Sequence, residues 1–304
     1  MRFSTITSLA IAIGPLAVSA AQGSLGFALG TKKADGTCKS QADYESDFKL
    51  INAASGSKLV RGYSASDCNA AQNILPAAKS QGFQVILGIW PDVESSFSAD
   101  KKAISTYATK FPEQLYAITV GSETLYRGNF TGEELLSKIQ EVKTLVKDTK
   151  IKVGTADSWN KFADGTADAL IKGNPDILLV NAFGFWQGQD ISNATHQYFD
   201  DMMQAYSHIS AIGGGNIEVW NGETGWPSDG GTDFGAAKAG TKNAATYFRE
   251  AVCGMTGWGF NAFFFEAFDE PWKPKSVGET GIAADEGHWG AMTADGKTKY
   301  SLKC

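Results

Sequence analysis

The feature that most constrains the fold of this chain is a regular alternation of short apolar runs with longer segments of helical periodicity. From residue 24 onward the chain contains eight runs rich in apolar and β-branched residues, whose starts lie about 25 to 40 residues apart. We expect strands at residues 24–29, 58–63, 83–90, 115–121, 151–155, 177–183, 216–221 and 260–266. Such alternation is typical of βα units around a parallel sheet.

The segment 131–148 shows the helical periodicity between these runs. Thr131 and Glu134 form the pattern of a capping box, in which each side chain accepts a hydrogen bond from a backbone N–H at the start of a helix. The apolar residues that follow share one helix face: Leu135, Leu136, Ile139 and Val142. The segment therefore predicts a helix with one buried face.

Eight βα units in 304 residues predict an α/β fold with a single (β/α)8 TIM barrel, which typically takes about 250 residues. The alternative is an open doubly wound sheet, whose first βα turn carries a Gly-rich phosphate loop. The chain reads GFALGTKKADGTCKS after the first run and contains neither a GxGxxG nor a P-loop motif there, so we expect no nucleotide cofactor. No linker-like segment divides residues 21–304, which predicts one domain.

Residues 1–20 have the pattern of a secretory signal peptide. Arg2 is followed by an apolar run over residues 9–18 and then by small residues. A membrane anchor is the alternative, but this run is well short of the roughly 20 apolar residues that span a bilayer. We therefore expect cleavage near Ala20, export, and no membrane partner for the mature chain.

Cysteines provide a second indication of export. An even number of cysteines in an exported chain favours disulfides, and the absence of CxxC pairs argues against a metal site. Four cysteines allow three pairings, and their positions suggest Cys38 with Cys68 and Cys253 with Cys304. The sequons at Asn129 and Asn193 fit a glycosylated secreted protein.

Charge and aromatic content narrow the class of ligand. The formal net charge is −6 and no run of Lys and Arg is present, so the chain lacks the basic surface that a nucleic acid or an anionic membrane requires. The chain has 18 Phe, 9 Tyr and 8 Trp, which is more rings than a core needs. Because surplus rings often line ligand sites, we expect a neutral ligand in an aromatic cleft.

Two glutamates stand where a barrel of this kind builds its active site, at the carboxyl ends of its strands. Glu123 follows the run LYAITVGS, and Glu223 follows NIEVWNG. They are 100 residues apart, about three βα units, which would place the fourth and seventh strands on facing sides of the barrel mouth. A single glutamate at a strand end is most often an ion-paired or solvated group. Two at matching strand ends predict a carboxylate pair across one cleft.

A carboxylate pair across a cleft suits the cleavage of a glycosidic bond. One carboxyl group protonates the leaving oxygen while the other attacks or stabilises the anomeric carbon. The acid needs a raised pKa, and the nucleophile must be kept ionised by hydrogen bonds. We expect Glu223, near Asn221 and a Gly-rich turn, to be the nucleophile, and Glu123 to be the acid/base. For a retaining enzyme the two carboxyl groups would lie about 5 to 5.5 Å apart.

Six strings of the chain resemble, in the same order, those of glycoside hydrolase family 17: RGYSASDC, AITVGSE, NAFGFWQG, VWNGETGWPSDGG, FEAFDEPWK and EGHWGAMTADGKTKY. The resemblance covers essentially the whole mature chain and points to the fungal cell-wall branch of β-1,3-glucanases and glucanosyltransferases. It implies a retaining enzyme on a (β/α)8 barrel, with Glu123 as acid/base and Glu223 as nucleophile. These roles agree with those that the spacing predicts.

Ser122 departs from the pattern of the family. Many relatives carry Asn directly before the acid/base, where its amide contacts the sugar 2-hydroxyl, whereas this chain has Ser122. A serine hydroxyl reaches less far, so we expect the contact to be lost or to be made by another group such as Asn221. Similar serines occur in the fungal branch, so we still expect an active enzyme.

Further candidates for substrate binding lie at or just past the predicted strand ends. Glu266 and Lys273 form either an ion pair that binds sugar hydroxyls or a purely structural ion pair. Tyr63 ends the second predicted strand, where its hydroxyl would reach a carboxylate or a sugar. Rings near the strand ends either stack on sugar faces or pack in the core: Trp90, Phe183, Phe185, Trp186, Trp226 and Trp272.

Together with the family resemblance, these features predict a secreted, monomeric cell-wall enzyme that cleaves β-1,3-glucan without a metal or other cofactor. The released segment passes to water or to a second glucan, and the residues leave that choice open. The alternative is a wall-binding protein that keeps the barrel and the aromatic cleft but does no chemistry. The presence of both Glu123 and Glu223 argues against it.

Overall fold

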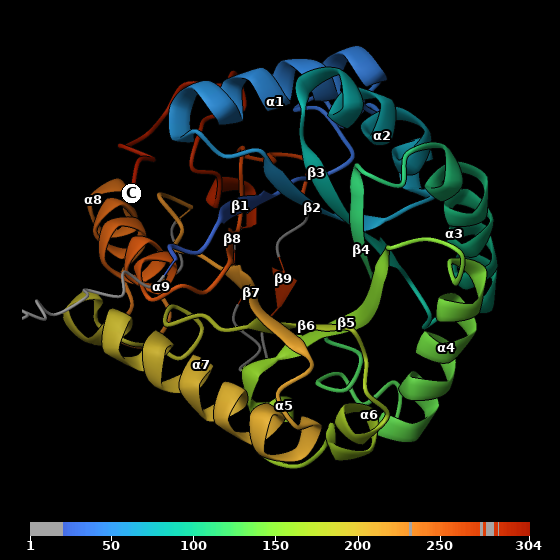
Figure 1. Cartoon of the computed structure of the whole chain (residues 1–304). Helices are drawn as coiled ribbons and strands as arrows, with labels where there is room; N and C mark the ends of the chain where they lie inside the picture. Colours follow the sequence, from blue (N-terminus) through green and yellow to red (C-terminus); the bar gives the residue numbers. More distant parts are fainter. Residues whose placement is uncertain (1–20, 231–232, 274–275, 278–282, 285) are drawn as a thin grey trace, which may run out of the picture.

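The computed structural model describes residues 21–230, 233–273, 276–277, 283–284 and 286–304, which form a closed barrel of eight parallel strands surrounded by helices (Figure 1). The barrel strands are β1 (Leu25–Ala28), β2 (Leu59–Ser64), β3 (Gln84–Ile89), β4 (Leu115–Ser122), β5 (Lys152–Ser158), β6 (Ile177–Asn181), β7 (Glu218–Thr224) and β8 (Ala262–Phe264). Each predicted strand overlaps one of these, so the predicted (β/α)8 TIM barrel is confirmed. The predicted signal peptide lies outside the described residues.

Helices connect the strands along the outside of the barrel: α1 (Gln41–Ser55), α2 (Ala70–Gln81), α3 (Glu94–Tyr107), α4 (Gly132–Leu145), α5 (Trp159–Ala163), α6 (Asp168–Lys172), α7 (Ile191–Gly213), α8 (Thr241–Tyr247) and α9 (Cys253–Gly257). Shorter elements are the 3-10 helices η1 (Asp67–Asn69), η2 (Ala108–Lys110) and η4 (Glu286–His288) and the π-helix η3 (Phe248–Val252). A short antiparallel pair follows β8: β9 (Ser276–Val277) and β10 (Ala283–Ala284). No helix within the described ranges is long and apolar enough to cross a membrane.

Helix α4 begins as its sequence predicts. The Thr131 hydroxyl accepts a hydrogen bond from the Glu134 N–H at 3.3 Å, and the Glu134 carboxylate accepts one from the Thr131 N–H at 2.8 Å. Leu135, Ile139 and Val142 are buried, so the predicted apolar face packs against the fold. The helix ends three residues earlier than predicted, at Leu145.

The strands follow their sequence order around the barrel, and β1 closes it by pairing in parallel with β8 through Leu25 with Ala262 and Phe27 with Phe264. Because all eight strands are parallel, their carboxyl ends form one rim. Strands β4 and β7 are separated by β5 and β6, so residues at the ends of β4 and β7 face each other across that rim. The fold thereby brings the two glutamates, 100 residues apart in sequence, to one end of the barrel.

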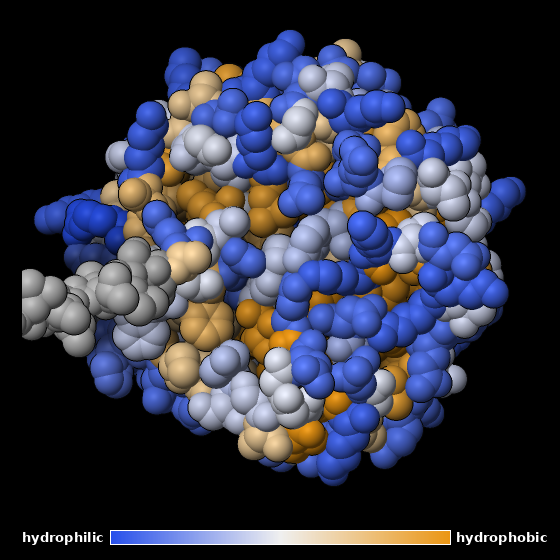
Figure 2. All heavy atoms as spheres, viewed as in Figure 1, coloured by the Kyte–Doolittle hydropathy of each residue, from blue (hydrophilic) through white to orange (hydrophobic). Residues whose placement is uncertain are grey.

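Apolar side chains fill the barrel and the layer between strands and helices. Inside the barrel, Leu59, Ile86, Leu179, Trp220 and Phe263 belong to one buried cluster. Residues on the opposite face of the strands join a larger buried cluster with the helices. Figure 2 shows apolar atoms toward the centre of the visible face and hydrophilic atoms around its periphery. The packed barrel is therefore a rigid support for the side chains at its rim.

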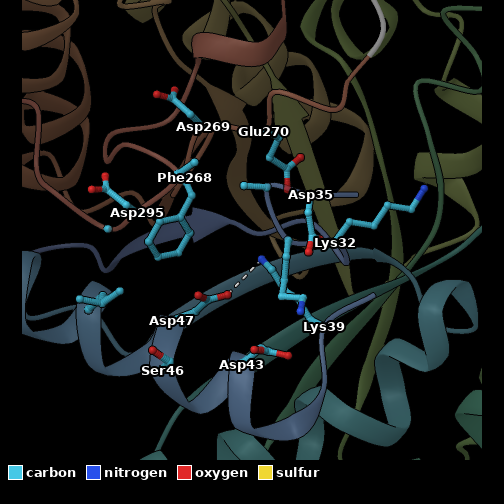
Figure 3. Close-up of a pocket in the computed structure, with 15 residues that line it drawn as sticks. Lys32, Asp35, Lys39, Asp43, Ser46, Asp47, Phe268, Asp269, Glu270 and Asp295 are labelled. Carbon is cyan, nitrogen blue, oxygen red and sulfur yellow. Dashed lines mark ion pairs between the residues drawn. The ribbon is translucent and has the colours of Figure 1, made fainter. Parts of the chain in front are cut away.

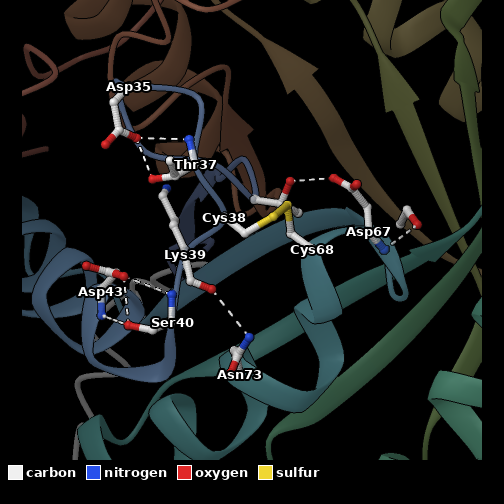
Figure 4. The surroundings of a disulfide bond; sticks show 11 residues. Asp35, Thr37, Cys38, Lys39, Ser40, Asp43, Asp67, Cys68 and Asn73 are labelled. Atoms are coloured by element: carbon white, nitrogen blue, oxygen red, sulfur yellow. Dashed lines mark hydrogen bonds between the residues drawn. A yellow bond between two sulfur atoms is a disulfide. The ribbon is translucent and has the colours of Figure 1, made fainter.

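Two disulfides join the pairs that the sequence suggests, Cys38 with Cys68 and Cys253 with Cys304, with Cα–Cα distances of 5.2 and 5.1 Å. The first joins the loop after β1 to the turn after β2 (Figure 4). Beside it, the Asn73 amide donates a hydrogen bond to the Lys39 carbonyl at 3.3 Å, which connects the loop after β1 to helix α2. Both predicted disulfides are thus confirmed.

The second disulfide should contribute most of its stability through the unfolded chain. Cys253 and Cys304 are 51 residues apart, so their bond closes a long loop in the unfolded state. Replacing both by Ser is expected to lower the free energy of unfolding by about 4 kcal/mol, because the unfolded chain regains that freedom. Urea unfolding of oxidised wild type and the double variant measures this difference; an unchanged midpoint would contradict it.

Candidate active site

Glu223 lies near the end of β7 and is held by a cation inside the barrel. Its carboxylate oxygen Oε1 is 3.0 Å from Nη1 of Arg61, whose side chain is completely buried on β2. The same guanidinium nitrogen donates a hydrogen bond to the Gly222 carbonyl at 2.8 Å. Since a buried cation requires an opposite charge, the barrel interior fixes Glu223 through Arg61.

The pKa of Glu223 depends on the balance of charges around it. Burial raises the pKa of this carboxyl group above its ordinary value, and the charge of Glu123 raises it further. Arg61, Tyr63 and Lys273 oppose this effect and lower it. The ionised form of Glu223, which a nucleophile needs, is therefore maintained mainly by Arg61. We had expected Asn221 and a Gly-rich turn to supply this stabilisation.

Glu123 directly follows β4 and is more accessible than Glu223, with 25% of its side chain exposed against 11%. Its carboxylate accepts a hydrogen bond from the Asn181 amide at 3.1 Å and one from the Arg127 guanidinium at 3.3 Å. Its backbone N–H donates to the Ala156 carbonyl at 2.9 Å. Both carboxylate oxygens of Glu123 thus have a partner that fixes the side chain at the rim.

A chain of polar contacts connects the two glutamates. Arg61, which pairs with Glu223, lies within 3.3 Å of the Asn181 amide oxygen, and the Asn181 amide nitrogen donates to Glu123. Arg61 also donates to the Ser122 hydroxyl at 3.2 Å. Ser122 therefore lies within the site, with Arg61 as its partner. The structure brings Glu123 and Glu223 into one connected polar group, as their spacing predicts.

Asn221 is a correction to the predicted site. Its side chain is completely buried and turned toward α7, where its amide nitrogen lies 3.6 Å from the sulfur of Met202. The same nitrogen donates to the carbonyls of Val180 and Glu223. Asn221 therefore holds the backbone behind Glu223 through hydrogen bonds. We had expected it to contact a sugar at the rim, and that expectation is wrong because the side chain is buried.

Trp226 is a second correction. Its ring is completely buried against Phe185 and Tyr247, at centroid distances of 5.1 and 5.4 Å. Its indole N–H donates to the Lys238 carbonyl at 2.8 Å, so its polar atom is used as well. Trp226 and the equally buried Phe185 are core rings, because neither exposes a face on which a sugar could stack.

The predicted pair of Glu266 and Lys273 forms. The Lys273 ammonium lies 2.7 Å from Glu266 and 2.9 Å from Glu270, a third member that we had not included in the pair. Burial and the charge of Glu270 raise the pKa of Glu266. Burial lowers the pKa of Lys273, but the two carboxylates outweigh it and raise the pKa overall. Because Lys273 also lowers the pKa of Glu223, this cluster is electrostatically part of the site.

The remaining predicted binding residues are half-buried rather than enclosed. Phe183 and Trp186 both contact Trp289, at centroid distances of 5.7 and 5.3 Å, and Trp186 is stacked on it. The Lys32 ammonium lies over the Trp272 ring, 4.9 Å from the ring centroid. Tyr63 lies beside Arg61, 5.1 Å from its guanidinium carbon. These rings retain exposed edges or faces, unlike Trp226.

Trp90 is half-buried after β3 and lies beside the partner of the proposed acid/base. The guanidinium carbon of Arg127 is 5.6 Å from the centre of the Trp90 ring. Because Arg127 also contacts Glu123, Trp90 packs close to the site, as we had expected from its place at a strand end.

A cavity of about 380 Å³ lies beside the Glu266 cluster, between the loop after β1, helix α1 and the loop after β8 (Figure 3). Phe268 and Glu270 line it from the β8 side, and Lys39 and Asp47 line it from the other. Its buried carboxylates already have cations, since Lys39 lies 3.0 Å from Asp47 and Lys273 pairs with Glu270. Glu123 and Glu223 do not line this cavity.

We had not singled out four residues that lie at or near the candidate site: Arg61, Asn181, Asp157 and Trp289. Arg61 is a charged residue within the apolar run KLVRGY, and a buried charge of that kind signals a carboxylate partner. Asn181 is the last residue of β6 and Asp157 the penultimate residue of β5, at the same rim as the glutamates. Polar residues at the ends of buried strands were a usable signal for both. Trp289 had no such signal, because it lies well beyond the last predicted strand, residues 260–266.

A barrel rim with two facing carboxylates and half-buried rings is an arrangement of glycoside hydrolases. The model of the BtgE/BtgC glycoside hydrolase domain matches residues 26–290 of the chain. The chain is a glycoside hydrolase and belongs to this family.

Relatives and solved structures agree with that assignment. The chain is 59% identical to a glucan 1,3-beta-glucosidase of Arthroderma benhamiae, over 100% of this chain and 98% of the relative. It is 43% identical to a glucan 1,3-beta-glucosidase of Saccharomyces cerevisiae, over 100% and 99%. The crystal structure of a glycoside hydrolase family 17 β-1,3-glucanosyltransferase from Rhizomucor miehei has a TM-score of 0.77 and 28% identity, over 91% and 97%. The predicted resemblance to family 17 is confirmed.

Proposed function

We propose that the chain is a secreted, monomeric cell-wall enzyme that cleaves β-1,3-glucan with retention of configuration and transfers the released segment to water or to a second glucan. The observation that carries this proposal is the polar chain from Glu223 through Arg61 and Asn181 to Glu123. The names of the relatives and the laminaritriose in a related Rhizomucor miehei structure support the substrate. The two disulfides support export.

In the first step, Glu223 attacks the anomeric carbon and forms a glycosyl ester. The bond between this carbon and the leaving oxygen breaks, and Glu123 gives its proton to that oxygen. Arg61 keeps Glu223 ionised before the attack through its 3.0 Å contact with the carboxylate oxygen Oε1. We assign the roles from the charged contacts, because Glu223 is paired with the buried Arg61, which favours its ionised form, whereas Glu123 is the more accessible group.

In the second step, Glu123 acts as the base. It takes a proton from a hydroxyl of the acceptor, whose oxygen attacks the anomeric carbon and displaces the Glu223 carboxylate. Glu123 is then protonated and ready for the next cycle. A water acceptor gives hydrolysis, and a glucan hydroxyl gives transfer. We propose Glu266 and Lys273 as hydrogen-bonding groups for sugar hydroxyls, and Tyr63, Phe183, Trp186 and Trp272 as contacts for sugar rings.

Product analysis on a β-1,3-glucan oligosaccharide of defined length tests this function. Fragments shorter than the substrate show cleavage, and products longer than the substrate show transfer. Both are resolved by chromatography with mass detection. Absence of any conversion by folded wild type, together with retention on insoluble glucan, would contradict the enzyme and favour a binding protein.

Arg61 gives the function a pH dependence that can be predicted. Burial raises the pKa of Glu223, and the nucleophile must be ionised, so the acid limb of kcat/KM in wild type should lie at higher pH than the titration of an ordinary glutamate. Arg61→Met removes the charge that lowers this pKa, so the acid limb should move to higher pH. Breaking the buried pair should also destabilise the fold by about 3 to 5 kcal/mol, so the profile is measured well below the unfolding temperature.

The control for this experiment is Lys143→Met, which removes a surface cation 2.7 Å from Asp176. Its pH profile should match wild type. An Arg61→Met profile with an unmoved acid limb would show that Arg61 does not hold the charge of Glu223.

A further inference from the structure

Asp157 is a buried carboxylate that the proposed mechanism does not use. It lies near the end of β5, next to β4, and is completely buried. Its oxygens accept hydrogen bonds from the backbone N–H groups of Leu125 at 2.8 Å, Tyr126 at 3.1 Å and Ser158 at 2.9 Å. The first two donors belong to the turn that directly follows Glu123. Asp157 thus binds the backbone on which the proposed acid/base stands.

That turn needs such support, because its backbone is in an uncommon conformation. Glu123 has a φ of 58°, in the left-handed region that residues with a side chain rarely adopt. The end of β5 holds the turn at two places: the Ala156 carbonyl accepts the Glu123 N–H at 2.9 Å, and the Asp157 carboxylate accepts the N–H groups of Leu125 and Tyr126. Without the second set, the turn would lose two of the hydrogen bonds that support Glu123 in this conformation.

The charge of Asp157 also couples it to Glu123. Burial raises the pKa of Asp157 to about 7, the hydrogen bonds from Leu125 and Ser158 oppose this, and the charge of Glu123 adds to it. The two carboxyl groups are therefore close enough to influence each other. Arg127 and Asn181 face Glu123 from the other sides.

We propose that Asp157 is a positioning residue for the acid/base: it fixes the turn after β4 so that the Glu123 carboxyl group points at the oxygen of the scissile bond. This inference rests on the proposed function. It makes a specific claim, because a displaced Glu123 should impair proton transfer while leaving attack by Glu223 intact.

The test compares two substrates that differ in their need for a proton. In a laminari-oligosaccharide the leaving group is a sugar alcohol, which needs a proton from Glu123. In a dinitrophenyl β-glycoside of a laminari-oligosaccharide the leaving group is dinitrophenolate, a stable anion that needs no proton. In Asp157→Asn the amide oxygen can replace one carboxylate oxygen, but the amide NH₂ faces the Leu125 N–H, donor against donor. We expect kcat/KM on the oligosaccharide to fall by about 10- to 100-fold, and on the aryl glycoside by less than about threefold.

Azide gives a second readout that a merely structural role would not move. Azide attacks the glycosyl ester without a general base, so it should raise the turnover of the aryl glycoside by Asp157→Asn and give a β-glycosyl azide. Wild type should respond little.

The control residue, Asp176, precedes β6 and contacts β5 at the end opposite to Asp157. Asp176 accepts the N–H of Val153 in β5 at 2.9 Å, so Asp176→Asn also alters a backbone contact of β5. It should match wild type on both substrates. Should Asp157→Asn fail to fold, Asp157→Glu, which keeps the charge but displaces the turn, should show the same split.

An equal loss on both substrates in a folded Asp157 variant, with no azide effect, would overturn the inference. Inactivity of wild type on both substrates would instead refute the proposed function, so the two failures are distinguishable.

Discussion

Glu223→Gln is expected to lose turnover of β-1,3-glucan oligosaccharides by about ten-thousand-fold or more, because the amide cannot form the glycosyl ester. Glutamine keeps the volume of the side chain, and its oxygen can still accept from the Arg61 guanidinium at the 3.0 Å contact. The variant should therefore still fold. Initial rates on a laminari-oligosaccharide, with thermal unfolding of the same preparation, measure both effects.

Glu218→Gln is the matched control for that variant. Glu218 is the first residue of β7, at the opposite end from the rim, where it contacts Lys152 and the Tyr116 hydroxyl. The control should keep the wild-type rate. Activity of Glu223→Gln equal to wild type would remove Glu223 from the mechanism.

Glu123→Ala is expected to lower turnover of the oligosaccharide by about 100- to 10,000-fold, the usual contribution of general acid–base catalysis. The first step on a dinitrophenyl glycoside needs no protonation, so its rate should change little. Added azide should then restore turnover of that substrate and give a β-glycosyl azide, because azide needs no base. Kinetics with and without azide, with product analysis by NMR, measure this.

Glu133→Ala serves as the control for Glu123→Ala, because Glu133 is an exposed acidic residue in the first turn of α4. It should leave both rates unchanged. A Glu123 variant that loses both substrates equally and does not respond to azide would contradict the acid/base role.

The barrel itself was predictable because each strand is a buried apolar run with clear limits. The capping box at Thr131 and Glu134 fixed the start of α4, and both disulfide pairs followed from the position of the cysteines. The two glutamates were found because parallel strands of a barrel end at one rim. The strands, the start of α4, the disulfides and the position of the glutamates could be predicted because they depend on local residue patterns and on the order of the strands along the chain.

Asn221 was placed wrongly because strand periodicity fails at this site. Strict alternation would put Asn221 and Glu223 on the same face of β7. The register of β7 against β6 and β8 shifts at these residues, so Glu223 faces the barrel interior while Asn221 faces α7. An irregularity of one residue reverses every side-chain direction after it. Such a bulge has no signature in the apolar pattern, so the sequence could not reveal it.

Trp226 was placed wrongly for a different reason. It lies beyond the end of β7, in a loop, and the ring's surroundings come from Phe185, Tyr247 and the carbonyl of Lys238. These contacts join segments that are far apart in sequence. Proximity to a strand end therefore identifies carboxylates at the rim better than it identifies sugar-binding rings, since Trp and Phe pack equally well in the core.

The stereochemistry of the first product tests the central claim most directly. Wild type is mixed with a β-1,3-glucan oligosaccharide whose reducing end is blocked, so that only a newly formed reducing end gives a signal. The anomeric protons of the released sugar are followed by NMR from the first minutes. Double displacement at Glu223 and Glu123 predicts that the new reducing end appears as the β-anomer and only later equilibrates with the α-anomer. Initial release of the α-anomer would contradict the account, because it would mean a single displacement by water.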